Sequence, residues 1–269
     1  MRLEGKRVLV VGASSGLGRA TALAVAAEGA RVALAARRRE RVEEAAREAG
    51  EAAFALACDV RDEASCGRAV ESAVARFGGL DGLVYSPAIS TFGPIETIGA
   101  AAWREVFDTN VIGVSLLLNA AIPHLTQSRG KVVVYSSIVI DDSPPRPGQA
   151  SYVVSKHALE RLVEAWQGEH RAVGFTSIAS GDAVTEFGHD HDLETLTPIV
   201  QRWAELEYLY GRAMDAQSVA AQAVNALASP ETVRRIAITP RYPVEDPEAR
   251  AHSAEREFEQ MGRKPATER

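Results

Sequence analysis

The chain has 269 residues, of which 46% are hydrophobic and 25% charged, and 36 acidic residues against 30 basic ones give a formal net charge of −6. Nucleic-acid binding needs a basic surface, so this balance argues against a general nucleic-acid binder. The two cysteines, Cys58 and Cys66, have no metal-type spacing and fit a reduced, cytoplasmic setting. The first apolar strand starts near residue 7, which leaves no room for a signal peptide, and no apolar run approaches the ~20 residues of a membrane span.

Strand-like and helix-like segments alternate along the chain, as expected for α/β proteins. The predicted strands are 7–11, 30–36, 52–58, 80–86, 131–136, 174–179 and 235–239. The predicted helices are 19–28, 39–49, a helix from the N-cap Asp62 to Phe77, 100–125 and 151–171. Short connections indicate right-handed crossovers. We therefore expect one oxidoreductase domain over residues 1–243, with a doubly wound Rossmann fold and a parallel seven-stranded sheet covered by helices on both faces.

Two regions interrupt this alternation. Residues 181–211 follow the end of a strand, where ligands bind in such sheets, so this insert is expected to form a substrate lid. Its aromatic residues fit two interpretations equally, because they could cover an apolar substrate or pack the helix of the insert itself. They are Phe187, Trp203, Tyr208 and Tyr210. The charged tail 244–269, with a short helix near 249–261, is expected to be exposed, mobile or laid on a neighbouring subunit.

The first predicted strand runs directly into a glycine-rich turn that opens the first helix. Gly12 lets the chain turn sharply, while Gly16 and Gly18 allow close approach of a ligand and of the sheet. The first amides of a helix lack internal partners and, with the helix dipole, favour an anion such as a pyrophosphate. The spacing Gly-x-x-x-Gly-x-Gly is not the common one, but its place between strand and helix favours nucleotide binding over plain packing. The expected cofactor contacts are Gly12, Ser14, Ser15, Gly16, Leu17 and Gly18.

Three arginines, Arg37, Arg38 and Arg39, follow the second predicted strand, where this fold meets the adenosine ribose. No acidic residue stands there to hold the 2′-hydroxyl of NAD, whereas a guanidinium binds the oxygens of a 2′-phosphate bidentately. The sequence therefore favours NADP(H) over NAD(H), with Arg37 the best-placed residue and Arg38 second. The alternative is a solvated, charged start of a helix.

Asp59 directly follows the third predicted strand. There it could accept a hydrogen bond from the adenine amino group, with Cys58 and Val60 lining the ring. A turn or N-cap aspartate is the alternative interpretation.

A second motif, Tyr152-Val-Val-Ser-Lys156, opens the helix after the fifth predicted strand. The i to i+4 spacing puts Tyr152 and Lys156 on one helical face. A tyrosine with a pKa near 10 is a poor acid–base catalyst at pH 7, and a neighbouring ammonium is expected to lower that pKa. Such a pair could pass a proton to or from a carbonyl oxygen. The strand before it ends in Ser136-Ser137, whose hydroxyls could hydrogen-bond a substrate oxygen.

A polar residue, Asn110, interrupts the apolar helix predicted over 100–125. It could kink the helix, hold a water or cap a local bend.

Taken together, these motifs resemble the short-chain dehydrogenase/reductase family in its single-domain form, from about residue 5 to residue 240. The resemblance implies that Tyr152 is the acid/base, and that Lys156 lowers its pKa and binds the nicotinamide ribose. It implies that Ser137 orients the substrate oxygen and that Asn110 holds a water that relays protons to Lys156. The family usually has this serine about 13 residues before the tyrosine, so Ser137, 15 residues before it, implies a longer loop, and Ser136 is the fallback. The residues that carry the resemblance are the turn 12–18, Asp59-Val60, Asn110 with Gly113, Ser137, and Tyr152 with Lys156.

The chain departs from the family pattern in three places. Tyr85-Ser86-Pro87-Ala88 stands where Asn-Asn-Ala-Gly is usual, and because Pro87 lacks an amide donor and Ala88 adds a methyl, we expect a reshaped cofactor site. Ser180-Gly181 replaces the usual Pro-Gly, and the usual Asp-Gly-Gly near the last strand is missing. The further cofactor contacts expected here are Ser86, Pro87, Ala88, Gly181, Val184 and Thr185, with Thr185 near the nicotinamide amide or the pyrophosphate.

The expected function is an NADP(H)-dependent oxidoreductase acting on a ketone or secondary alcohol of a mainly apolar, medium-sized molecule. Apolar residues that follow two strands suggest this substrate class: Ile138, Val139, Ile140 and Val184. The alternative is a nucleotide-binding regulatory or scaffold protein of the same fold without turnover. The resemblance implies a homodimer or homotetramer built on helices 100–125 and 151–171. The net charge and the lack of a long apolar run predict no nucleic-acid or membrane partner.

The run His189-Asp190-His191-Asp192 has alternating ligand types that could converge on a metal. It lies in a predicted loop without a third ligand cluster. We therefore expect a solvated polar loop and no metal.

Overall fold

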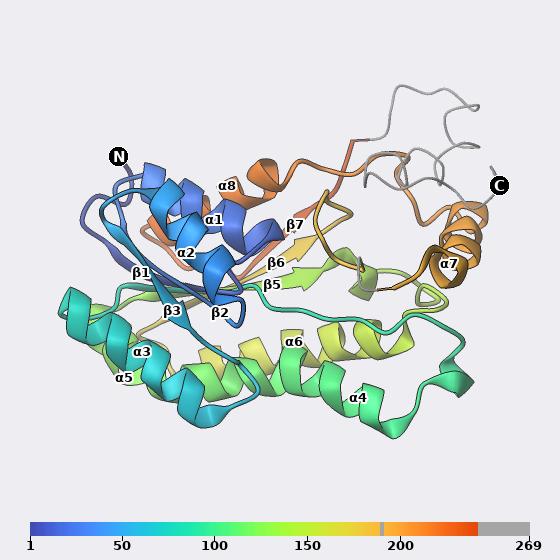
Figure 1. Cartoon of the computed structure of the whole chain (residues 1–269), viewed down its shortest axis with the longest axis horizontal. Coiled ribbons are helices and arrows are strands. Elements are labelled where there is room, and N and C mark those ends of the chain that lie inside the picture. The colour runs from blue at the N-terminus through green and yellow to red at the C-terminus, as the bar shows by residue number, and fades with distance from the viewer. Residues whose placement is uncertain (189–190, 242–269) are drawn as a thin grey trace.

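Seven parallel strands form one sheet in the order β3-β2-β1-β4-β5-β6-β7 (Figure 1). The computed structural model describes residues 1–188 and 191–241, so the predicted tail 244–269 lies outside the described residues. The order reverses direction between β1 and β4, which is the switch point of a doubly wound sheet. This confirms the expected Rossmann fold. The strands are β1 Arg7–Val11, β2 Arg31–Ala36, β3 Ala53–Ala57, β4 Gly82–Tyr85, β5 Lys131–Ser137, β6 Gly174–Ser180 and β7 Arg235–Ile238.

Helices cover both faces of the sheet (Figure 1). One face carries α1 (Gly16–Ala27), α2 (Arg39–Ala49) and α8 (Ala216–Ala228), and the other carries α3 (Glu63–Phe77), α4 (Ala100–Phe107), α5 (Gly113–Ser128) and α6 (Ala150–Glu169). Two apolar cores fill the layers between helices and sheet. The strands inside the sheet, such as β1 and β4, read as continuous apolar runs because both of their faces are buried, whereas the edge strands β3 and β7 are more exposed. Beyond the end of the sheet lies α7 (Leu193–Glu205).

The predicted helix over 100–125 is one helical run interrupted by a π-helical turn at Asp108–Ile112. Asn110, which the sequence analysis links to a bend, lies in this turn. The sequence analysis did not predict α8, although Asp215 caps it by accepting a hydrogen bond from the amide of Gln217. The three-residue 3₁₀ turns Ile95–Thr97 and Ile138–Ile140 were also not predicted.

The helical run Ala100–Ser128 is long and apolar enough to cross a membrane, with a mean hydropathy of 1.4 over 18 residues. The sequence analysis expected no such run. Its buried side chains, among them Leu117, Ala121 and Leu125, belong to the core beneath the sheet. Core helices of soluble proteins pass the same test of length and composition, and 44% of the apolar window is buried in the structure, so core packing accounts for part of its apolar character.

Two helical glycines meet opposite surroundings. A Cβ at Gly18 in α1 would lie 2.2 Å from the carbonyl oxygen of Gly12, whereas a Cβ at Gly67 in α3 meets nothing within 4 Å. We expect Gly18→Ala to lower the free energy of unfolding by about 1–3 kcal/mol through overpacking. Gly67→Ala should raise it by up to about 1 kcal/mol through helix propensity. Urea denaturation of both variants and the wild type measures the difference, and equal stability of Gly18→Ala and wild type would contradict the tight contact.

Candidate active site

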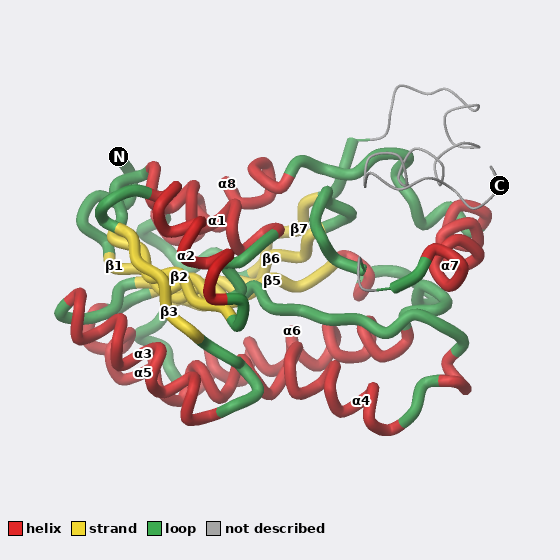
Figure 2. Tube along the Cα trace, in the orientation of Figure 1, coloured by secondary structure: helices red, strands yellow, loops and turns green. Residues whose placement is uncertain are grey.

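A cavity of about 570 Å³ lies at the carboxyl ends of the strands, where the loops of Figure 2 gather. Its lining comes from the segments that follow six strands, β1 to β6. Most of the predicted site residues line it: Gly12, Ser14, Ser15, Gly16, Leu17, Arg37, Arg38, Asp59, Val60, Ser86, Pro87, Ala88, Ser137, Tyr152, Lys156, Gly181 and Thr185. Three do not: Gly18 packs behind the turn, Val184 is exposed, and Asn110 is buried outside the lining.

The glycine turn has the backbone that its sequence predicts. Gly12 and Gly16 have φ values of +83° and +52°, which only glycine adopts readily. The amide of Gly12 donates to the carbonyl of Ala35 at 2.8 Å, which holds the turn to β2. Among the described residues no side chain caps the first amides of α1, although Ser15 stands at the N-cap. These amides therefore face the cavity as donors for an anion.

Of the two arginines expected at the ribose, Arg38 is the one that reaches the glycine turn. Its guanidinium donates to the hydroxyl of Ser15 at 2.7 Å and to that of Ser14 at 3.1 Å. Arg37 lines the same cavity and is exposed. The structure thus brings Arg38, the second choice of the sequence analysis, into contact with the glycine turn.

Asp59 is held by its neighbour Arg61. Its carboxylate accepts hydrogen bonds from the backbone amide of Arg61 at 3.0 Å and from the guanidinium at 2.9 and 3.1 Å. The Arg61 guanidinium lowers the pKa of this carboxyl below its usual value. These bonds are those of a turn aspartate, and Asp59 also lines the cavity, where contact with an adenine stays a prediction.

The predicted reacting groups lie together at the other end of the cavity. Tyr152 and Lys156 are both buried, and the Lys156 ammonium lies 5.5 Å from the centre of the Tyr152 ring. Lys156 Nζ donates to the carbonyl oxygen of Tyr135 at 2.8 Å. Burial lowers the pKa of Lys156 to about 8.

The pKa of Tyr152 differs from the expectation. Burial raises it to about 12, and a hydrogen bond with Ser137 lowers it in part. The sequence analysis expected Lys156 to lower this pKa. The ammonium is instead committed to Tyr135, and removal of the phenol from water dominates.

Asn110 is fully buried, and its amide ties three elements together. Its Oδ1 accepts from the amide of Ile89, and its Nδ2 donates to the carbonyl of Ile89 and to the hydroxyl of Ser155, each at 2.9 Å. The loop after β4 is thereby fixed to α6 through the π-helical turn. The water relay to Lys156 stays a prediction.

The unusual Tyr85-Ser86-Pro87-Ala88 segment packs against the glycine turn and the helical layer. A Cβ at Gly12 would lie 2.8 Å from the nitrogen of Pro87, so proline and glycine fit each other closely. The buried hydroxyl of Tyr85 donates to the carbonyl of Thr109. A Cβ at Gly113 would lie 2.7 Å from the oxygen of this hydroxyl. Glycine at 113 thus makes room for this tyrosine.

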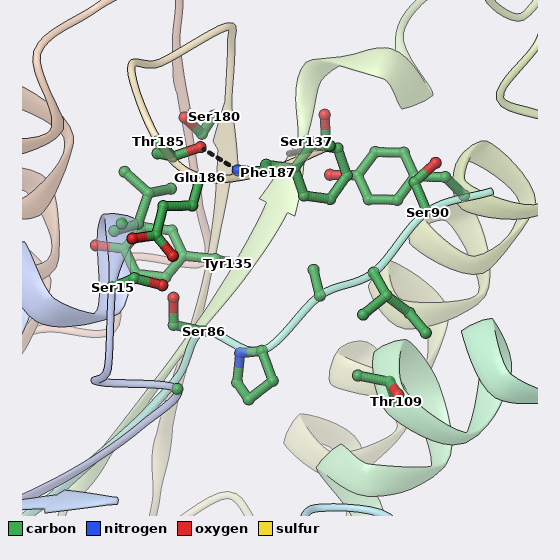
Figure 3. A pocket seen from close by; sticks show the side chains of 18 of the residues that line it. Ser15, Ser86, Ser90, Thr109, Tyr135, Ser137, Ser180, Thr185, Glu186 and Phe187 are labelled. Atoms are coloured by element: carbon green, nitrogen blue, oxygen red, sulfur yellow. Dashed lines mark hydrogen bonds between the residues drawn. The ribbon is translucent and has the colours of Figure 1, made fainter. Parts of the chain in front are cut away.

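The segment after β6 covers the reacting end of the cavity (Figure 3). The ring of Phe187 lies 5.1 Å from that of Tyr152. Trp203 of α7 both lines the cavity and packs with Leu196 and Val200 of its own helix. Trp203 therefore fits both interpretations of the insert's aromatic residues, since it faces the cavity and packs the helix of the insert. Tyr208 packs against the same apolar cluster of Leu196, Val200 and Trp203.

A buried arginine joins this lid segment to the loop after β5. The Arg146 side chain is 1% exposed, and it pairs with Asp142 at 2.7 Å and with Asp182 at 3.2 Å. It also donates to the carbonyl of Tyr208 at 3.1 Å. The two carboxylates outweigh the desolvation of this guanidinium, so its pKa stays above the usual value.

Sequence reasoning missed several residues that line the cavity. Two of them have a weak signal in the sequence. Arg146 is a charged residue between two prolines, and Glu186 follows the expected contact Thr185. Neither signal indicates which residue the side chain pairs with. The other missed lining residues include Ser90, Phe92 and Gln149, and His191, considered only for a metal, lines the cavity as well.

The considered metal motif is only partly described, because His189 and Asp190 lie outside the described residues. Nε2 of His191 lies 3.2 Å from the carbonyl oxygen of Ser90, and the His191 ring packs edge-on against the ring of Phe92. Asp192 caps α7 by accepting from the amide of Thr195 at 2.7 Å. Both side chains thus have local roles.

The cavity suits a dinucleotide on its own geometry. The glycine turn offers free helix amides at one end, and the buried Tyr152 and Lys156 stand at the other. Ser136 also lines this cavity, and its hydroxyl is buried with no hydrogen-bond partner among the described residues. A buried donor without a partner is costly, so a ligand in this cavity would supply one.

Comparison with known proteins agrees with this geometry. A family model described as short chain dehydrogenase matches residues 6–194. An uncharacterized oxidoreductase of Methylorubrum extorquens is 36% identical over 194 residues, which is 70% of this chain and 77% of that protein. The alcohol dehydrogenase of Thermococcus sibiricus, solved with 5-hydroxy-NADP, is 26% identical with a TM-score of 0.75, covering 90% of this chain and 98% of its own. A 3-ketoacyl-(acyl-carrier-protein) reductase of Brucella melitensis, solved with NADH, is 27% identical with a TM-score of 0.77, covering 88% and 97%.

The buried Lys156 predicts a pH-dependent stability. Its pKa is about 8 in the folded chain against its ordinary 10.5, so the unfolded chain binds more protons between these values and stability rises with pH there. The gain is up to about 3 kcal/mol, from ~1.4 kcal/mol per pKa unit. Tyr152 acts in the opposite direction above pH 10, so urea denaturation from pH 7 to 10 measures the Lys156 effect.

The wild type is compared with Lys156→Met, which removes the buried charge. The free energy of unfolding of this variant should no longer rise between pH 8 and 10. Lys6→Met, at an exposed lysine, should keep this rise. If the free energy of unfolding of Lys156→Met depended on pH in the same way as that of the wild type, burial of the Lys156 ammonium would not be the source of the pH dependence.

Proposed function

The chain belongs to the short-chain dehydrogenase family, a family of oxidoreductases, and on that premise we propose that it transfers a hydride between NADP(H) and a ketone or secondary alcohol. One observation carries the proposal. A single cavity joins the glycine turn with Arg38 to the buried Tyr152, Lys156 and Ser137.

The cofactor would lie along this cavity. The amides at the start of α1 would hold its pyrophosphate, and Arg38 its 2′-phosphate, because a guanidinium suits phosphate oxygens. Arg37 stands beside it as a second cation. Support for a nicotinamide dinucleotide also comes from the two similar structures, one solved with an NADP derivative and the other with NADH.

When bound, the cofactor would supply or accept the hydride, and its oxidised ring would add a positive charge beside the reacting groups. Tyr152 would donate a proton to the carbonyl oxygen during reduction or remove one from the alcohol during oxidation. Its hydrogen bond with Ser137 supports a role for that serine in orienting the same oxygen. With its pKa raised to about 12, Tyr152 holds its proton at neutral pH, which suits reduction.

The substrate would be mainly apolar and of medium size. Aromatic and aliphatic side chains line the cavity together with Tyr152, and Arg146, a fully charged group buried there, is already paired with Asp142 and Asp182. These apolar residues are Phe92, Val139, Phe187, Leu196, Val200 and Trp203. A homodimer or homotetramer is also proposed, since the helices expected at its interface expose Ile112 and Val154.

The cofactor preference is tested by fluorescence titration with NADPH and with NADH. We expect NADPH to bind at least about tenfold more tightly, since a charge-assisted contact contributes ~1.5–3 kcal/mol. Arg38→Ala should weaken NADPH by about tenfold and leave NADH within about twofold. Arg39→Ala, at an exposed arginine paired with Glu43, is the matched control. An NADPH affinity of Arg38→Ala equal to that of the wild type would remove the 2′-phosphate role from Arg38.

The acid/base role is tested by Tyr152→Phe in a screen of apolar ketones with NADPH. Turnover should fall by at least about 10²-fold, the usual contribution of a positioned acid, while the dissociation constant of NADPH stays within about twofold. Tyr208→Phe removes a hydroxyl that donates to Pro144 outside the cavity lining and should retain turnover. Substantial activity of Tyr152→Phe would contradict the assignment, and binding of NADPH without turnover by the wild type would favour the scaffold alternative.

A further inference from the structure

Glu186 reaches from the lid segment across the mouth of the cavity to two arginines at the start of α2. Its carboxylate lies 3.1 Å from Nη1 of Arg38 and 2.7 Å from Nη1 of Arg41. Figure 3 shows the Glu186 side chain extending toward Ser15 of the glycine turn. Residues 145 or more positions apart in the chain are thus joined at this point.

The same Arg38 guanidinium serves both sides of this contact. Its Nε and Nη2 donate to the hydroxyls of Ser14 and Ser15, and its Nη1 donates to Glu186. A carboxylate and a phosphate are both oxyanions that seek guanidinium donors. A 2′-phosphate on Arg38 would therefore meet a carboxylate already bound to it, and the two negative charges would repel each other.

We propose that Glu186 is an internal competitor of the 2′-phosphate, and that it determines how strongly the protein prefers NADP(H) over NAD(H). The inference rests on the proposed function, because it requires Arg38 to bind the 2′-phosphate. NADH carries no phosphate at this position, so it leaves the contact of Glu186 with the arginines intact. NADPH displaces Glu186 from Arg38, and part of its binding energy is lost in doing so.

The same contact couples cofactor choice to the lid. Glu186 follows Thr185, which lines the cavity beside Gly16, and precedes Phe187, which covers Tyr152. Its ion pairs tie this segment to α2, on the opposite side of the cavity mouth. Loss of the Arg38 contact therefore loosens the segment that covers the reacting tyrosine, whereas binding of NADH does not.

The magnitude of the effect follows from the exposure of the groups. Glu186, Arg38 and Arg41 have side chains that are 44%, 47% and 49% exposed, so solvent screens each pair. We expect removal of the Glu186 charge to tighten NADPH binding by about three- to tenfold at low salt. The gain should shrink as salt rises, because the Debye length falls from ~30 Å at 0.01 M to ~8 Å at 0.15 M.

The test compares Glu186→Gln with Glu43→Gln. Glu43 pairs with Arg39 on the exposed face of α2 at 2.7 Å, so its variant makes the same change of charge on the neighbouring helix without touching Arg38. NADPH and NADH are titrated separately by fluorescence at 0.01 M and 0.15 M salt. Glu186→Gln should tighten NADPH and leave NADH within about twofold, whereas Glu43→Gln should change neither.

A second measurement needs no cofactor. Hydrogen–deuterium exchange of residues 181–188 should be faster in Glu186→Gln than in the wild type or Glu43→Gln, because the tie to α2 is weakened. Unchanged exchange would overturn the proposed tie.

The outcomes separate the inference from the function beneath it. If the wild type prefers NADPH but Glu186→Gln leaves its affinity unchanged, the competitor role is wrong and the proposed function stands. If Glu186→Gln tightens NADH as much as NADPH, the effect is not on the 2′-phosphate, and the inference is overturned. If no variant binds NADPH, the proposed function and the inference fail together.

Discussion

The arrangement of the cavity depends on how closely α1 approaches β1. At Gly18 there is no room for even a methyl group, because the carbonyl of Gly12 occupies the place where a Cβ would stand. Pro87 closes on Gly12 from the other side. This packing holds the first turn of α1 at the carboxyl edge of the sheet with its amides uncapped. The first amides of α1 remain available to an anion because no side chain caps them and because the close packing at Gly12 and Gly18 fixes where they lie.

At the other end of the cavity the dominant physical effect is desolvation. Lys156 and Tyr152 are both removed from water, and burial moves their pKa values in opposite directions, toward the neutral form of each. The Tyr135 carbonyl holds the ammonium in place. A cation and a phenol kept apart from water in this way are poised to respond to any charge that a ligand brings into the cavity.

Local patterns in the sequence were enough to predict the sheet. They were also enough to predict those parts of the site whose residues are nearly consecutive in the chain. β1 and α2 have the predicted bounds, and Asp62 caps α3 as expected. The turn at Gly12 and the Tyr152–Lys156 pair were found because each lies within a few consecutive residues. The lid was predicted as an insert, without the detail of its contacts.

Contacts between distant segments could not be read from such patterns. The partners of Asn110 lie 21 and 45 residues away, and Glu186 pairs with arginines near the start of the chain. The choice between Arg37 and Arg38 depended on which guanidinium reaches Ser14 and Ser15, 24 and 23 residues away from Arg38, and no local spacing specifies that. The pKa of Tyr152 was misjudged because burial depends on the whole fold.

Arg146 couples two of the loops that line the cavity. One guanidinium, withdrawn from solvent, holds Asp142 of the loop after β5 and Asp182 of the segment after β6, and it also holds the carbonyl of Tyr208. Moving either loop alone would strand a charge in a poorly solvated place, which is far more costly than moving both. The two loops therefore behave as one wall. Substitutions of cavity-lining side chains on α7, such as Leu196 and Val200, would therefore change the shape of the cavity more readily than movements of the loops themselves.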